Sequence, residues 1–131
     1  MTIASMEALR DAIRASAGPA RELDATFARL VLGWTGVRFN PAIAEWLGSP
    51  PGLFADVVPM FTAQRAGPGA LFAAARERWP ECSISTHSSG VDAVCAVNLH
   101  NGIIKSGTHP FLTHALALAM VEAAIQERNN G

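Results

Sequence analysis

The sequence predicts an α+β fold in which a small, mainly antiparallel sheet of three to four strands lies between α-helices, as α/β/α layers. Three features support this class. Apolar residues recur at helical spacing in the first third of the chain, a later segment alternates as strands do and contains an Asn-Gly turn, and the last segment has the composition of a buried helix. At 131 residues, half of them hydrophobic, the chain has the length of one domain. We expect a single domain over 1–131, with an N-terminal helix over 1–18 and the layered region over 20–126.

The first two helices are each predicted from one apolar face. One spans 3–17 and ends at Gly18-Pro19, because a glycine followed by proline stops a helix. The other lies within 21–34, where Gly33 is the C-cap and brings Trp34 back onto the core. The apolar faces consist of Ile3, Met6, Leu9 and Ile13 in the first helix and of Leu23, Phe27, Leu30, Val31 and Trp34 in the second. Asp24 falls at the margin of the second face. An acid in this position usually anchors a neighbouring backbone loop, and Asp24 is also a candidate partner-binding residue.

The segment 35–60 has a weaker pattern. PAIAEWLG predicts a short helix with Pro41 at its first position, and SPPG predicts a turn. Pro59 restricts the β-rich run VVPMF to an edge strand. Trp46 and Phe54 become candidate partner-binding residues if they are exposed here, since aromatic side chains dominate interface energetics. A third helix is predicted from near Pro68 to the residue before Pro80.

Three consecutive strands are predicted from CSISTH, VDAVCAVNLH and IIKS, which form a meander. Asn101-Gly102 is a strong signal for a two-residue hairpin turn, and the other turn is predicted at Ser89-Gly90. Alternation then places an apolar set of side chains on one face and a small, half-polar set on the other. The apolar set is Cys82, Ile84, Ala93, Cys95 and Val97, and the other set is Ser83, Ser85, His87, Asp92, Val94, Ala96 and Asn98.

The last helix is predicted to open at Thr108 or His109, with Pro110 in its first turn. Its run FLTHALALAMVEAAIQ is apolar almost all round, which indicates burial on several sides or a homodimer interface through this helix. Glu122 lies on its apolar side and needs a partner or a route to water. The candidate partners are Arg29, Arg76 and Arg78.

Three segments, in order, resemble the phage ABA-sandwich domain family of small phage and prophage proteins. They are RELDATFARLVLGW, PMFTAQRAGPGALFAAARERW and THPFLTHALALAMVEAA, and together they cover roughly 20–126. The chain departs from the family pattern where His109 is inserted between Thr108 and Pro110, and at Gln64 and Gly67-Pro-Gly, where the family tends to carry a serine and an acidic residue. The resemblance implies an α/β/α sandwich and a phage or prophage origin, and it implies no reaction.

Two residue patterns suggest a metal site and a hydrolase site, but each has a simpler structural explanation. Cys82, His87, Cys95 and His100 have the spacing C-x4-H-x7-C-x4-H, but residues five apart in a strand point to opposite faces, so no metal site is expected. Ser85, His87 and Asp92 share a sheet face, with His87 and Asp92 expected directly across the hairpin. No sharp nucleophile turn or oxyanion site accompanies them, so a polar patch is the preferred interpretation over a hydrolase.

An anion site is the best small-ligand candidate in the sequence. Thr108 and His109 would present the free N–H groups of a helix N-terminus, which favour negative ligands. If the layers of the family hold, Thr62 and Gln64 lie near them. The alternative is plain helix capping.

Composition narrows the functional classes. Ten basic and eleven acidic residues are spread along the chain, so direct nucleic-acid binding is not expected. Two cysteines are too few for a disulfide framework, and no membrane span, signal core or cofactor motif is evident. Because of the family resemblance, the lack of a convincing catalytic constellation and the apolar last helix, we expect a non-enzymatic phage or prophage accessory protein in the bacterial host cytoplasm. It would act by binding a host or phage protein, as a counter-defence inhibitor for example. The alternatives are a protein that binds a nucleotide-like anion and a small hydrolase.

Overall fold

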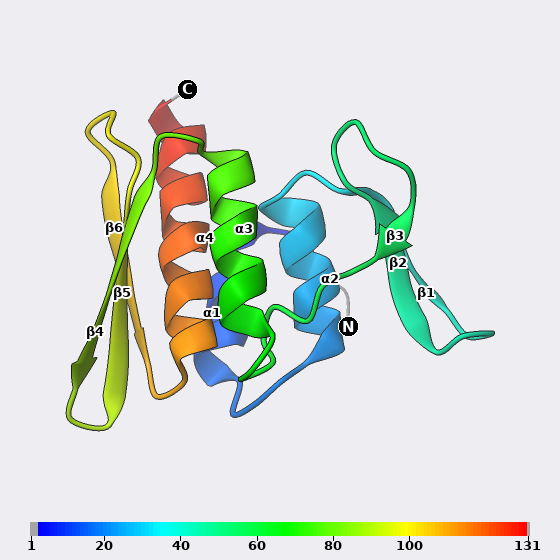
Figure 1. Cartoon of the computed structure of the whole chain (residues 1–131), viewed down its shortest axis with the longest axis horizontal. Helices are drawn as coiled ribbons and strands as arrows, with labels where there is room; N and C mark the ends of the chain where they lie inside the picture. The colour runs from blue at the N-terminus through cyan, green and yellow to red at the C-terminus, as the bar shows by residue number, and fades with distance from the viewer. Residues whose placement is uncertain (1–2, 131) are drawn as a thin grey trace.

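The computed structural model describes residues 3–130, which form four helices between two three-stranded antiparallel sheets (Figure 1). The helices are α1 (Met6–Ala15), α2 (Arg21–Leu30), α3 (Gly67–Arg78) and α4 (Leu112–Asn130). One sheet contains β1 (Thr35–Asn40), β2 (Glu45–Ser49) and β3 (Asp56–Val57). The other contains β4 (Ser83–Ser89), β5 (Asp92–Asn98) and β6 (Ile104–His109).

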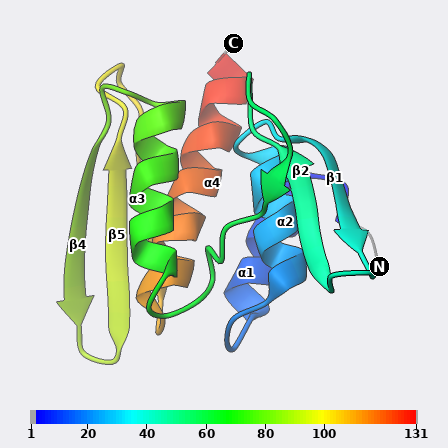
Figure 2. The same ribbon diagram turned by 45° about the vertical axis from the view of Figure 1, so that its right-hand side comes forward.

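The α+β class and the small antiparallel sheets are confirmed, and the layers have a particular order. In Figures 1 and 2 the helices occupy the middle of the molecule, with the β4–β6 sheet on one side and the β1–β3 sheet on the other. Helix α4 covers one face of the β4–β6 sheet. Its other face has no helix against it in either view. The sequence predicted one sheet with helices on both of its sides. The structure instead has one layer of helices between two sheets.

Helix α4 is central because it is apolar on every side. Every residue from Thr113 to Val121 is buried, against β5 and β6 on one side and against α1 and α3 on the others. The contact with β6 is close: a Cβ added to Gly107 would lie 2.4 Å from the Ala115 carbonyl oxygen and 2.6 Å from Leu118 Cβ. The apolar composition that suggested a homodimer through this helix is therefore explained by packing within the chain.

The meander β4–β5–β6 is confirmed, with two differences in its turns. Ser89 pairs with Asp92, so the first turn is Gly90-Val91 rather than Ser89-Gly90. Gly90 has φ +63, which glycine adopts without strain. The turn can therefore close at this residue. In the second turn Leu99 donates its N–H to the Ile103 carbonyl, which leaves three residues in the loop instead of two.

Residues 35–60 form a β arm rather than a helix, which corrects the interpretation of PAIAEWLG. Pro41 lies in the turn between β1 and β2, where Asn40 Oδ1 accepts the Ala42 N–H at 3.0 Å. Phe39 and Trp46 then face each other across the two strands with ring centroids 5.6 Å apart. Such an aromatic pair stabilises a hairpin, and a helix would forfeit it. We call residues 35–60 the β arm.

The SPPG turn is confirmed at Pro51-Gly52, and the helix predicted from near Pro68 is α3. The edge strand predicted from VVPMF is the two-residue β3, which ends before Pro59. At the C-terminal end of the meander, β6 extends through His109, and α4 starts at Leu112. The interpretation of Thr108 and His109 as the start of the last helix is therefore wrong. Both residues pair with β5 instead.

Candidate functional site

The exposed large hydrophobic side chains are concentrated on the β arm. Eight such residues occur among the described residues, and six of them lie between positions 39 and 60. These six are Phe39, Ile43, Leu53, Phe54, Val57 and Met60. Soluble proteins usually cover apolar side chains that lie together, and those left exposed commonly mark a binding surface.

A groove of about 750 Å³ lies between this arm and α3. Its apolar lining comes from the arm, from residues just before and after the arm, and from α3: Leu32, Trp34, Pro50, Pro51, Leu53, Val57, Pro59, Phe61, Ala70, Ala73 and Ala74. Asp56, Glu77 and Arg78 add the charged part of the lining. A volume of this size is within the range of sites that hold small ligands or the side chains of a partner.

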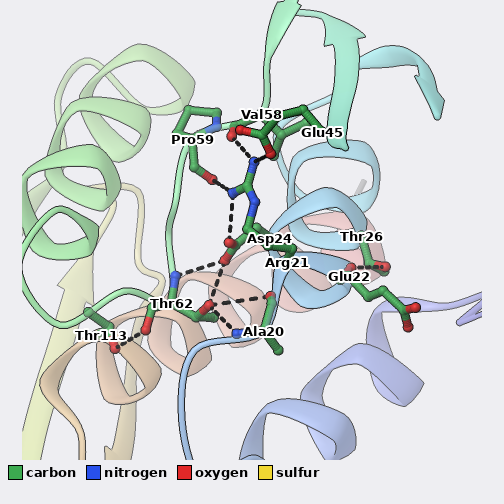
Figure 3. A network of polar contacts seen from close by, with 10 residues as sticks. All are labelled: Ala20, Arg21, Glu22, Asp24, Thr26, Glu45, Val58, Pro59, Thr62 and Thr113. Atoms are coloured by element: carbon green, nitrogen blue, oxygen red, sulfur yellow. Dashed lines mark hydrogen bonds and ion pairs between the residues drawn. The ribbon is translucent and has the colours of Figure 1, made fainter. Parts of the chain in front are cut away.

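The wall of the groove is held in place by a polar network around Asp24 (Figure 3). The Asp24 carboxylate accepts the Thr62 N–H and the Thr62 hydroxyl, both at 2.8 Å. Arg21 donates to Asp24 at 2.9 Å and to Glu45 of β2 at 3.1 Å. The network therefore joins α2 to β2 and to the segment that leads into α3.

Arg21 also donates to the carbonyl oxygens of Val58 and Pro59, at 2.6 and 3.1 Å. These two carbonyls have no strand partner beyond the short β3, so the guanidinium replaces a sheet ladder here. Asp24 is only 1% exposed, and burial raises the pKa of its carboxyl, although Thr62 and Arg21 act in the opposite direction. The anchoring role expected from the position of Asp24 on α2 is what the structure shows. Its burial leaves no surface for a partner.

The two aromatic candidates of the arm differ in exposure. Phe54 is 95% exposed in the loop between β2 and β3. Trp46 is half-buried, because it packs against the core and against Phe39. Phe54 can therefore present nearly its whole side chain to a partner, and Trp46 only part of it.

The four residues of the candidate anion site are not brought together at a helix N-terminus. Thr62 is buried in the Asp24 network, and Gln64 is exposed in the turn before α3. Thr108 pairs with Val94 and is exposed, whereas the next residue, His109, is buried. Because successive residues of a strand point to opposite faces, Thr108 and His109 cannot bind one ion.

His109 instead belongs to a pair of buried, stacked imidazoles with His114, whose ring centroids lie 4.6 Å apart. His109 Nε2 donates to the Ser16 carbonyl at 3.0 Å, and its Nδ1 accepts the Phe111 N–H at 3.0 Å. His114 Nε2 donates to the Gly18 carbonyl at 3.1 Å. Burial lowers the pKa of His114, and the electrostatic interaction with the neighbouring His109 lowers it further. The pair ties the start of α4 to the joint between α1 and α2.

The hydrolase pattern changes with the register of the hairpin. His87 pairs with Val94, and Asp92 pairs with Ser89, so the expected position of His87 directly across from Asp92 is wrong. Ser85 and His87 are both exposed. The outer face of the sheet at these residues is therefore an open surface of small and polar side chains.

The four residues of the zinc-like spacing are separated as the strand geometry predicted. Cys82 and Cys95 are buried, and burial raises the pKa of the Cys95 thiol to about 11. His87 and His100 are exposed, and His100 bonds to Ser83. Among residues 3–130 no group of three or more His, Cys, Asp and Glu side chains is arranged to hold a metal ion.

Glu122 finds its partner in α1 rather than in any of the three arginines proposed from the sequence. Arg10 lies 3.1 Å from its carboxylate. Arg78 instead pairs with Glu127, and Arg29 donates to the Ile3 carbonyl. Because Arg10 is polar and lies on the margin of α1, its position over α4 was not visible in the helical pattern.

Sequence reasoning missed most of the groove. Leu53 was not identified as a site residue, Val57 was considered only as part of an edge strand, and Ala70 and Ala73 were treated as ordinary helix residues. The run PPGLFAD could have indicated the exposed apolar residues, because its Leu and Phe follow a turn and belong to no predicted helix or strand. Apolar residues in such a position have no predicted face to pack on.

A comparison of the chain with protein-family models, with curated proteins and with solved structures finds no match. Within residues 3–130, no helix combines the length and the hydropathy that crossing a bilayer requires.

Proposed function

We propose that this chain is a non-enzymatic phage or prophage accessory protein that binds a host or phage protein through its β arm. The observation that carries the proposal is the concentration of exposed apolar side chains on the arm beside the groove. Phe54 and Leu53, 95% and 66% exposed, would be the anchors, because apolar side chains that enter a partner contribute most of the binding free energy.

The phage origin rests on the resemblance of the three segments between residues 20 and 126 to the phage ABA-sandwich family. An inhibitor of a bacterial defence protein is one form that such an accessory protein takes. In that form the protein acts in the cytoplasm of the bacterial host. The buried state of α4 favours a partner of a different kind over a homodimer through that helix.

The test is the capture of bacterial proteins by the purified chain and by two variants. Leu53→Ser with Phe54→Ser removes both anchors, and Val91→Ser is the matched control, since Val91 is 88% exposed on the far sheet. We expect the wild type and the control to retain the same protein by mass spectrometry, and the double variant to lose it. A captured protein that all three chains retain equally would contradict the proposal, as would the absence of any specific partner.

A further inference from the structure

The groove between the β arm and α3 carries a second property, its charge. Three charged residues line it, namely Asp56, Glu77 and Arg78. Arg78 is engaged within the chain, because its guanidinium pairs with Glu127 and lies 5.0 Å from the Trp79 ring centroid. Its Nε also donates to the Val31 carbonyl.

The two acidic residues are not compensated in this way. Within residues 3–130 neither Asp56 nor Glu77 forms an ion pair, and the Asp56 carboxylate accepts only the N–H of its neighbour Val57. Both side chains are exposed, Asp56 on the arm and Glu77 on α3. The apolar groove is therefore flanked on both walls by a carboxylate without a cation.

The α3 wall suits a helix as the occupant. Ala70, Ala73, Ala74 and Glu77 have the spacing i, i+3, i+4 and i+7, so they form one stripe along α3. Helix α3 packs against α4 with another face, which leaves this stripe toward the groove. Small side chains let a second helix approach closely, and an amphipathic helix that places its apolar face in a groove is a common mode of peptide recognition.

We propose that the groove binds an amphipathic helical segment of a partner protein, with its apolar face on the alanine stripe and Lys or Arg beside Asp56 and Glu77. This inference rests on the proposed function and names the class of partner segment. Opposite charges at the edges of an apolar contact set the orientation of the partner and exclude acidic competitors.

The probe is a synthetic amphipathic helix of leucine and lysine, compared with a peptide that has glutamate at every lysine position. Binding is measured by isothermal titration calorimetry. We expect the lysine peptide to bind at least about tenfold more tightly than the glutamate peptide, with an affinity that falls as salt is added. The double substitution Asp56→Asn with Glu77→Gln should lower the affinity for the lysine peptide by at least about threefold, which is the loss expected for two exposed ion pairs.

Two further variants locate the site. Ala73→Trp fills the groove from an exposed helix position and should abolish binding, while its circular dichroism and melting temperature stay close to those of the wild type. Glu22→Gln with Glu81→Gln removes the same net charge from exposed residues that do not line this groove and should leave the affinity within about twofold.

Each outcome has a defined meaning. Equal binding of both peptides that Ala73→Trp abolishes would overturn the inference about charge and leave the proposed function standing. No binding of the lysine peptide, or binding that Ala73→Trp leaves unchanged, would overturn the helix-binding inference altogether. The proposed function is then decided separately, by the capture experiment with the Leu53 and Phe54 variants.

Discussion

At the scale of single residues, Asp24 explains how an irregular segment keeps a fixed course. The segment from Val58 to Thr62 has little strand or helix of its own, so its backbone groups need partners from elsewhere. Asp24 and Arg21, three positions apart on α2, supply them. One ion pair on a helix thus replaces the hydrogen bonds that a sheet would provide.

We predict that Asp24→Ala lowers the free energy of unfolding by about 3 kcal/mol, because it leaves the Thr62 N–H and part of the Arg21 guanidinium without their acceptor. Glu22→Ala, an exposed acid on the same helix, should cost about 0.5 kcal/mol or less. Urea denaturation of the two variants and the wild type measures both values. Equal losses would show that the network adds no specific stability.

His114 makes the stability depend on pH in a predictable direction. Its pKa is lowered in the folded chain, so the unfolded chain binds the proton more readily. The stability that this neutral imidazole contributes is therefore fully present above about pH 6.5 and is lost as the pH falls through the lowered pKa. We predict a lower free energy of unfolding at about pH 5.5 than at about pH 7.5.

The measurement compares the free energy of unfolding at these two pH values in the wild type, in His114→Gln and in His87→Gln. His114→Gln removes the titrating group and should flatten the profile, even though it lowers the stability at both pH values. His87→Gln changes an exposed histidine on β4, outside the stacked pair, and it should keep the wild-type slope. A slope that persists in His114→Gln would assign the pH dependence to another group.

At the scale of secondary structure elements, α4 and β6 approach so closely that a glycine is needed between them. Gly107 lets the helix backbone touch the strand, and the α3 start is equally close to its neighbours at Gly67, where a Cβ would lie 2.3 Å from the Phe61 carbonyl oxygen. These glycines are required for the space they leave and not for an unusual φ angle. The contact fixes the distance between the helix layer and the sheet.

We predict that Gly107→Val lowers the free energy of unfolding by about 3 kcal/mol or more, because the new side chain would overlap the Ala115 carbonyl and Leu118. Gly69→Ala is the matched control: nothing lies within 4 Å of its added Cβ, and alanine is the better helix former inside α3. It should raise the stability by up to about 1 kcal/mol. Thermal and urea unfolding measure both. A tolerated Gly107→Val would mean that α4 can shift away from the sheet.

At the scale of the whole molecule, features that depend on local interactions could be predicted from the sequence, and features that depend on contacts between distant segments could not. The four observed helices and the three strands of the β4–β6 meander depend on periodicity within one segment, and their presence and order were predicted correctly. The β arm was not, because Asn40-Pro41 is as suitable before a helix as in a turn, and the contact of Phe39 with Trp46 decides between the two. The start of α4 was placed too early because Thr108 and His109 pair with β5, a contact that local capping rules do not consider.

The candidate site was predicted less well than the fold, for the same reason. The helical phase of Asp24 indicated an anchor, but its partner Thr62 lies 38 positions away and was assigned to a ligand site instead. Phe54 was identified from its residue type in an irregular segment. The groove itself joins α2, the arm and α3, and no single stretch of sequence contains it.

The β1–β3 sheet is attached to the rest of the molecule through α2, and among the residues of its strands only Gly48 is buried. Its surface residues can therefore be exchanged with little effect on the folding of the helices and of the β4–β6 sheet. In a lineage under pressure to follow a changing partner, substitutions at Ile43, Leu53 and Phe54 would alter recognition while the core sequence stayed nearly constant. Related chains should then diverge fastest in the arm, and a chimaera that carries the arm of one relative on the body of another should fold and take the specificity of the donor.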